Sequence, residues 1–317
     1  MHIFDKVFSP GTSLTILALA VAFMVLEYLL ARLAFHDIET HDLRESAASV
    51  AIAMGQQGIK ALEAGLVAIP FALAYNHRLL DFDASAPLAI AALFVATEFF
   101  YYWQHRAAHR IRWMWATHAV HHSPTRMNFT AAIRLGWTGT ISGNFLFYLP
   151  LAWIGFNPLA VIAMLGANLF YQFFVHTELA PRLGPLEWVL NTPTHHRVHH
   201  ASNASCLDHN YGGVLIVFDR LFGTFAEAPK SEPLRYGLVG VAPTLNPLRV
   251  ALGEWGRMLA DLRHARSLKE CMTVLFAPPG TFNTPGKTPG DNPRAADPGK
   301  TNRSALPLHD TPLVPGE

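Results

Sequence analysis

YYWQHRAAHRIRWMWATHAVHH, residues 101–122, holds five histidines and is the most informative segment of this chain. Its first two histidines are four residues apart, and its last three follow the spacing i, i+3, i+4. Residues three or four apart lie on one face of a helix, so we expect each set to point its imidazoles in a single direction. The five residues are His105, His109, His118, His121 and His122.

The segment HHRVHH repeats the second spacing further along the chain, at His196, His199 and His200. Neutral imidazole is the commonest protein ligand for transition metals and suits iron, zinc and copper. Structural zinc takes four ligands and catalytic zinc takes three plus water, so eight imidazoles exceed the needs of one metal. The pattern therefore predicts a site for two metals. All-nitrogen ligation at a membrane surface favours a pair of irons that activates O2.

Further residues near these clusters are candidates for ligands or supports. His176 ends an apolar segment four residues after Gln172, and we predict His176 as an additional ligand with Gln172 as its support. Glu98 precedes His105 by seven residues, and Asp208 lies in DHNYGG. Each carboxylate is predicted to accept the spare N–H of a ligating ring, the alternative being a hydrogen bond in the bundle or a loop.

The remaining histidines carry weaker signals. Eleven of the 17 lie between residues 105 and 209, and the other six are scattered and interpreted as structural or solvated. His195 is off the face shared by its neighbours, and His209 lies in an expected loop. We interpret His195 and His209 as supporting or structural residues rather than ligands.

The composition indicates a chain with much surface in lipid. It is 51% hydrophobic and 15% charged, whereas a soluble domain carries about 25% charged residues. The net charge of +1 gives no electrostatic basis for binding nucleic acid. Cys206 and Cys271 form no CxxC motif, which excludes a disulfide scaffold and a thiolate zinc module.

Four apolar segments predict membrane helices. Residues 12–35 are long enough to cross a hydrocarbon core of ~30 Å, and Glu27 within them indicates a face turned toward protein. Residues 47–75 form a second run, and a third begins after Pro87 and leads into His105. Residues 139–176 are broken by GFNP and predict a helical hairpin, either crossing or re-entrant. We therefore expect an all-α integral membrane protein: about four to five membrane helices capped by a histidine-rich helical domain.

The charge pattern and the C-terminal composition suggest how the chain is arranged. Five arginines between residues 106 and 137 predict that the histidine domain lies on the cytoplasmic side. The compact length and the lack of a retrieval signal predict a bacterial inner membrane. Residues 1–276 are expected to form the membrane domain, with a histidine core at 98–224. Residues 277–317 hold nine prolines and are predicted to be a disordered tail.

The motifs together also carry a family resemblance. HRAAH, HAVHHSP, TPTHHRVHH, DHNYGG and DRLFGT, between about Glu98 and Thr224, resemble the fatty acid hydroxylase and sterol desaturase family of membrane di-iron oxygenases. The resemblance implies a small helical bundle with a cytosolic cap that holds two irons, for which zinc can substitute during purification. It implies nine ligands: His105, His109, His118, His121, His122, His176, His196, His199 and His200.

The activity that this resemblance implies is the O2-dependent hydroxylation or desaturation of a lipid C–H bond. The lipid is left open among a sterol, a fatty acyl chain, an alkyl ether lipid and an aminolipid. Because no HPGG haem segment is present, electrons are expected from a separate cytochrome b5, ferredoxin or reductase. The chain departs from the family pattern at Glu98, where Asp is common, and at Phe218, where Trp is frequent. The alternative is a non-redox zinc hydrolase or a structural metal-binding membrane protein, against which stands the lack of an H-E-x-x-H helix.

Overall fold

The computed structural model describes residues 9–35 and 40–282, and these residues are helical or irregular. Extended segments in these ranges pair only at two isolated bridges, Leu190 with Leu215 and Ala201 with Tyr236. The prediction of an all-α chain is therefore confirmed for the part that the structure describes. Most of the tail at 277–317 lies outside the described residues, so its predicted disorder stays a prediction.

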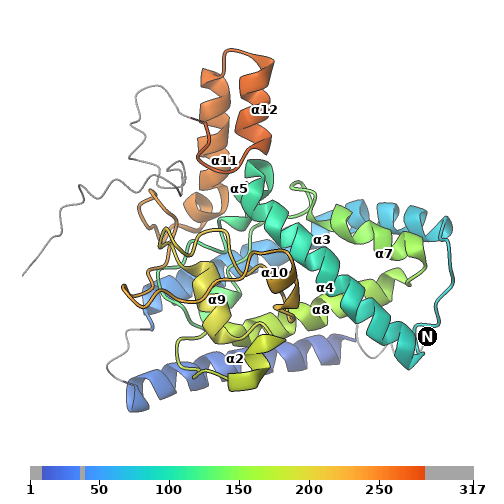
Figure 1. Ribbon diagram of the computed structural model, residues 1–317, viewed down its shortest axis with the longest axis horizontal. Helices are drawn as coiled ribbons and strands as arrows, with labels where there is room; N and C mark the ends of the chain where they lie inside the picture. Colours follow the sequence, from blue (N-terminus) through green and yellow to red (C-terminus); the bar gives the residue numbers. More distant parts are fainter. Residues whose placement is uncertain (1–8, 36–39, 283–317) are drawn as a thin grey trace, which may run out of the picture.

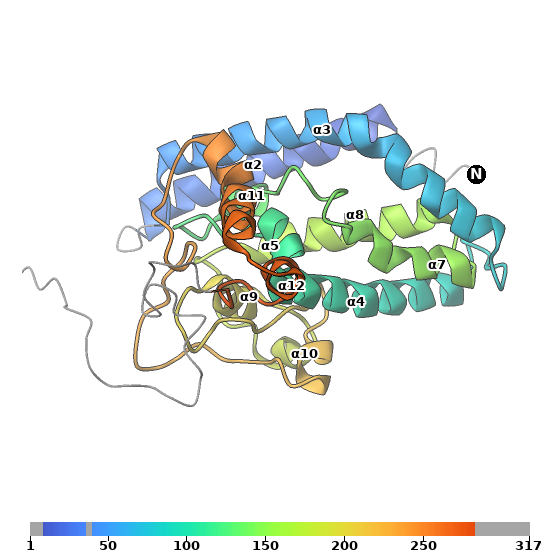
Figure 2. The ribbon, with the colours of Figure 1, turned by 90° about the horizontal axis from the view of Figure 1, so that it is seen from above.

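Four long helices lie beside one another and make up the body of the molecule (Figures 1 and 2). They are α2 (Pro10–Ala34), α3 (Leu43–Asn76), α4 (Pro87–Arg110) and α8 (Pro158–Val175). The sequence defines their starts, because α2, α4 and α8 each carry proline in the first turn, where no N–H is needed. The side chain of Asn157 also caps α8 by accepting from the Leu159 N–H at 2.9 Å.

Helices α2 and α8 are long and apolar enough to cross a membrane. Helix α3 adds a third span if its two pieces, Leu43–Glu63 and Gly65–Asn76, which meet at 51°, are counted as one. The first arm of the predicted hairpin is shorter than a span: it consists of η1 (Asn144–Tyr148) and α7 (Leu149–Ile154). The described residues therefore contain two to three candidate spans, where the sequence predicted four to five helices.

The GFNP break turns the chain sharply between α7 and α8. Gly155 adopts φ 136°, and a Cβ at this position would lie 2.3 Å from the carbonyl oxygen of Leu80. Only glycine combines this backbone angle with so close an approach. Leu79 and Leu80 donate their N–H groups to the carbonyls of Trp153 and Ile154, which ties this turn to the loop before α4.

The apolar core lies between α3, α4, α7 and α8. It is formed by Phe71, Leu93, Tyr101, Tyr148, Leu151, Ala152, Phe156 and Val161. Glu27 on α2 is 3% exposed, and its carboxylate accepts the backbone N–H of Phe129 at 2.7 Å, at the start of α6 (Phe129–Ala132). The prediction that Glu27 faces protein is confirmed.

Short helices lie in the segments of the chain that follow α4 and α8 (Figure 2). They are α5 (Arg112–His118), η2 (Gly184–Trp188), α9 (Pro193–His200) and α10 (Val217–Leu221). Helices α11 (Pro247–His264) and α12 (Leu268–Phe276) stand out from the body as a hairpin (Figure 1). Arg112 joins this hairpin to α5 through an ion pair with Asp261 at 2.6 Å. The histidine-bearing elements thus meet where α4 and α8 end.

Candidate metal centre

Nine histidines form two adjoining groups at this place. Within each group, one ring nitrogen from every member lies within 4.8 Å of the others. The five-histidine group consists of His105, His109, His118, His122 and His199, of which all but the half-buried His118 are buried. The four-histidine group consists of His121, His176, His196 and His200, all buried.

Each histidine triplet is divided between the two groups. On α9, His196 and His200 are one turn apart and join the four-histidine group, whereas His199 joins the five-histidine group. Helix α5 ends at His118, and the turn that follows sends His121 to the opposite group from His122. The expectation that each triplet points in one direction is therefore wrong. The rings of His122 and His200 stack with centroids 4.4 Å apart, so the groups adjoin.

Main-chain carbonyls orient rings in both groups. Because a carbonyl oxygen only accepts, the Nδ1 atom that faces it must carry the hydrogen, and in a neutral ring the Nε2 atom is then a lone pair. Four rings are held in this way: His105 by Tyr211 (2.8 Å), His199 by His209 (2.9 Å), His121 by Arg134 (3.3 Å) and His176 by Gln172 (2.6 Å).

The Nε2 atoms of His121 and His176 face each other at 3.1 Å. Both rings donate from Nδ1, so in their neutral forms neither has a hydrogen to place between the two lone pairs. Either a proton or a metal ion must compensate their repulsion. Burial lowers the pKa of His121 to about 4 and that of His176 well below 6.5, which disfavours the proton at neutral pH.

The spacing of the remaining nitrogens fits metal ions. Nε2 atoms of neighbouring rings are 2.9 Å apart between His105 and His118 and 3.0 Å apart between His176 and His196. Two nitrogens bound at 2.0–2.1 Å and at right angles would be about 3.0 Å apart. The Nε2 atoms of His122 and His199 are buried without a hydrogen-bond partner, as expected for donors directed at an ion. The donor sets therefore fit one metal in each group.

The histidine cluster predicts how the metal-free protein responds to acid. Burial, reinforced by neighbouring rings, lowers the pKa of His118, His122 and His196 well below 6.5, so the unfolded chain takes up protons first as pH falls. The contribution of these neutral rings to the free energy of unfolding is thus fully present above pH 6.5 and is lost as pH falls toward 4. His121 alone corresponds to about 3 kcal/mol over this window. Thermal unfolding of chelator-treated protein between pH 7.5 and 5 measures the loss.

His121→Asn serves as the control in this titration, because it removes one buried imidazole and should make the pH dependence shallower. A melting temperature that is constant or rises on acidification would contradict the neutral, buried state of the rings.

The carboxylates proposed as supports differ in where they lie. Asp208 lies beside a ring of the five-histidine group, with its Oδ1 atom 3.6 Å from Nδ1 of His109. Glu98 does not play the predicted role. Its carboxylate accepts hydrogen bonds from the side chain of Asn168 and from the N–H groups of Val214 and Leu215, at 2.8 and 2.9 Å. Glu98 lies seven residues, about two turns or ~10 Å, before His105 on α4, so its carboxylate reaches α8 and the loop before α10 rather than the rings.

The other predicted supports act through their main chains or lie apart. Gln172 holds His176 through its carbonyl, while its side-chain oxygen accepts from the Tyr101 hydroxyl at 2.8 Å. His209 likewise offers its carbonyl to His199, and its own ring faces the carbonyl of Leu207. His195 is outside both groups and packs against Phe225. Sequence reasoning missed the carbonyls of Tyr211 and Arg134, since every residue carries one.

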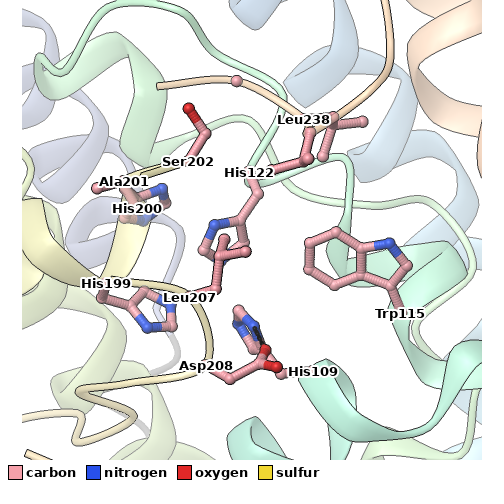
Figure 3. Close-up of a pocket in the computed structure, with 12 residues that line it drawn as sticks. His109, Trp115, His122, His199, His200, Ala201, Ser202, Leu207, Asp208 and Leu238 are labelled. Atoms are coloured by element: carbon pink, nitrogen blue, oxygen red, sulfur yellow. Dashed lines mark ion pairs between the residues drawn. The ribbon is translucent and has the colours of Figure 1, made fainter. Parts of the chain in front are cut away.

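A small pocket reaches the rings from outside. It has a volume of about 20 Å³, room for about one water-sized molecule, and is lined by His109, His122, His199 and His200. Figure 3 shows Asp208 and Trp115 beside these rings, with Leu207 and Leu238 also around the pocket. Its size suits a diatomic molecule or water rather than a lipid.

Comparisons with known proteins agree with this geometry. Residues 90–224 match the fatty acid hydroxylase family model. Alkylglycerol monooxygenase from Xenopus tropicalis is 40% identical over 206 residues, which cover 65% of this chain and 45% of the relative. The human alkylglycerol monooxygenase is 42% identical over 209 residues, covering 66% of this chain and 43% of the relative.

A bacterial relative matches as well. Ornithine lipid hydroxylase OlsE from Rhizobium tropici is 31% identical over 207 residues, 65% of this chain and 61% of the relative. The chain spans less than half the length of the two alkylglycerol monooxygenases. No solved structure matches it. The matched region contains all nine clustered histidines, so residues 90–224 are a fatty acid hydroxylase domain that carries the whole histidine centre.

Proposed function

We propose that this protein is a membrane-bound di-iron monooxygenase that hydroxylates a C–H bond of a lipid with O2. The observation that carries the proposal is the pair of adjoining groups of five and four imidazoles, with lone pairs facing each other at about 3 Å. This centre lies at the ends of α4 and α8, and α8 is long and apolar enough to cross a membrane. An oxidant for lipids needs this location, because its substrate is in the bilayer.

The five-histidine group would hold one iron and the four-histidine group the other. All nitrogen donors are neutral imidazoles, which suit iron and leave zinc as a substitute acquired during purification. When bound, the irons supply the redox chemistry by which one atom of O2 enters the C–H bond and the other leaves as water, with two electrons and two protons from outside. The small pocket beside His109 and His122 has room for a molecule the size of O2.

The two groups supply what the protein itself must contribute. Carbonyls fix the tautomers of His105, His121, His176 and His199, so four Nε2 lone pairs are directed inward before a metal arrives. A preoriented donor set loses little side-chain freedom on binding, which favours tight metal retention. A zinc hydrolase would not require nine imidazoles in two groups, because catalytic zinc takes three protein ligands and a water.

The relatives suggest the substrate class. The alkylglycerol monooxygenases match at 40–42% identity and the ornithine lipid hydroxylase at 31%, so we propose an alkyl ether of glycerol as the first substrate to test and an aminolipid as the second. Both relatives are named for the insertion of oxygen, as a monooxygenase and a hydroxylase, which favours hydroxylation over desaturation.

We further propose five features of this protein that its sequence predicts. The histidine cap faces the cytoplasm, supported by Arg110, which is half exposed beside the centre. The membrane is a bacterial inner membrane, and electrons come from a separate cytochrome b5, ferredoxin or reductase. Four to five helices contact the membrane, because α4 and the short α7 lie along α3 and α8 (Figure 2). Residues 1–276 form the membrane domain around the histidine core at 98–224, and 277–317 form a tail.

The proposal is tested on the full chain in lipid nanodiscs, loaded with iron and supplied with a chemical or protein reductant. Alkylglycerol and ornithine lipids are incubated in parallel under 18O2, and the products are analysed by mass spectrometry. The expected result is a product of one lipid with one added 18O atom and about two irons per chain. A new double bond without label would identify a desaturase. An O2-independent product formed by a zinc-loaded chain would favour the hydrolase instead.

A further inference from the structure

One loop, residues 208–213, orients three rings of the five-histidine group. The carbonyls of His209 and Tyr211 accept from Nδ1 of His199 and His105, and the Asp208 carboxylate lies beside Nδ1 of His109. The four-histidine group has different supports, the carbonyls of Arg134 and Gln172. A displacement of this loop would therefore misdirect rings of one group and leave the other in place.

The loop adopts a left-handed backbone conformation at two residues other than glycine. Asp208 and Asn210 have φ angles of 64° and 57°, in the left-handed region that non-glycine residues seldom occupy. At Gly212 a Cβ would lie 2.3 Å from the carbonyl oxygen of Leu215. Backbone of this kind persists only where the surrounding structure holds it.

Asp219, on α10, holds the centre of this loop, and the side chain of Asn191 holds its end by donating to the carbonyls of Gly212 and Gly213. The two carboxylate oxygens of Asp219 accept the N–H groups of Tyr211 and Gly212, each at 2.7 Å. The hydroxyl of Thr224 donates to the same carboxylate at 2.7 Å, and the carbonyl of Thr224 accepts the Asn210 N–H at 2.9 Å. Asp219 is fully buried, so these donors replace water around its charge. The two N–H contacts bracket the Tyr211 carbonyl that holds His105.

We propose that Asp219 is a positioning residue for the metal of the five-histidine group. By holding the main chain of Tyr211 and Gly212, it keeps the Tyr211 carbonyl on His105 and thereby keeps the lone pair of that ring on the metal side. The proposal rests on the proposed function, since it requires one metal in each group. It assigns Asp219 to one metal only, a selectivity that a residue acting on overall stability would not have.

The test is metal binding by Asp219→Asn in the full chain, measured as iron per polypeptide and as retention of each iron against a graded chelator. Asparagine has nearly the same shape but places an NH2 group against a backbone N–H. We expect one iron to be retained as in wild type and the other to bind roughly 10- to 100-fold more weakly, the effect of removing outer-shell partners. The spectroscopic signature of a coupled iron pair should change to that of a single iron.

Two further variants separate positioning from stability. Thr224→Val removes one donor to Asp219 and should weaken the same iron by a smaller factor, while Thr224→Ser should restore wild-type retention. Asp261→Asn removes a carboxylate from the ion pair with Arg112 on the hairpin, and it should lower the melting temperature while both irons stay bound.

The outcomes distinguish this inference from the proposed function. Wild-type protein that never binds two metals would overturn the proposed function itself. Two metals in wild type, with wild-type retention of both in Asp219→Asn, would overturn the positioning role. Equal weakening of both irons would do so too, because it marks a general structural effect. If Asp219→Asn does not fold, Thr224→Val decides between the same results.

Discussion

His121→Ala is expected to abolish the O2-dependent product and to remove one of the two metals. His121 lies in the four-histidine group with its Nε2 atom 3.1 Å from that of His176, so its ring supplies a donor that no neighbour can replace. The loss of activity should exceed the roughly 100-fold effect of removing an outer-shell partner. Product formation under 18O2 and metal per chain are measured on the same preparation. The other metal should remain, because the five-histidine group keeps all its rings.

His209→Ala is the matched control for this experiment. His209 lies close to the centre, but it supports His199 through its carbonyl, which alanine retains, while its ring faces Leu207. We expect nearly wild-type activity and two metals. A His121→Ala protein that keeps both metals and its activity would contradict the ligand assignment. Loss of activity in His209→Ala with wild-type metal content would show that its ring has a role beyond the main-chain contact.

Arg134→Met should produce the largest loss of stability among single substitutions outside the histidines. Arg134 is 1% exposed and donates to the Ser49 hydroxyl, the Ser123 hydroxyl and the Glu45 carbonyl at 3.0–3.2 Å. It also pairs with the Glu45 carboxylate at 3.4 Å. Methionine would leave that carboxylate without its cation, and breaking a buried pair costs roughly 3–5 kcal/mol. Since total stabilities are about 5–15 kcal/mol, this loss is a large fraction of the free energy of unfolding, and the variant should unfold at a much lower denaturant concentration.

The measurement is denaturant-induced unfolding of purified protein in mild detergent. Arg249→Met is the control, since Arg249 is exposed on α11 and its loss should change the unfolding free energy by less than about 0.5 kcal/mol. The double variant Arg134→Met, Glu45→Gln should be more stable than Arg134→Met alone, because it removes the uncompensated charge. A single variant within 1 kcal/mol of wild type, by this order-of-magnitude scale, would show that the pair is not a structural requirement.

Arg134 also illustrates how misleading a charge pattern can be. Counted along the sequence, it belongs to the arginines that predict the cytoplasmic side. In the structure both Arg134 and Arg112 are buried, with exposed fractions of 1% and 6%. Arg134 forms an ion pair with Glu45, and Arg112 forms one with Asp261. A charge that is paired inside the fold contributes little to the membrane orientation. Only the exposed arginines between residues 106 and 137 can therefore favour the cytoplasmic side.

The sequence by itself determined the helical class and the identity of the clustered histidines. Long apolar segments predict membrane helices, because a helix satisfies its own backbone hydrogen bonds in lipid. Histidines at helical spacing beside them predict a metal centre, because neutral imidazole is the commonest metal ligand. His176 could be found because it ends an apolar helix, where a histidine has no other evident use. The eight histidines in the spaced sets were also sufficient to predict two metals, since eight exceed the ligands that one metal takes.

Only the tertiary structure decided which ring belongs to which group. A triplet at i, i+3, i+4 looks like one face, but the end of α5 at His118 and the position of α9 between two sites divide both triplets. The packing of the helices determines where each helix ends and how it is rotated about its axis. Neither property can be predicted from the spacing of residues in the sequence. The residues that orient the rings could not be predicted from the sequence either. Tyr211, Arg134 and Gln172 act through main-chain carbonyls, which every residue has. Their function comes from where the chain brings them, which the order of side chains alone does not specify.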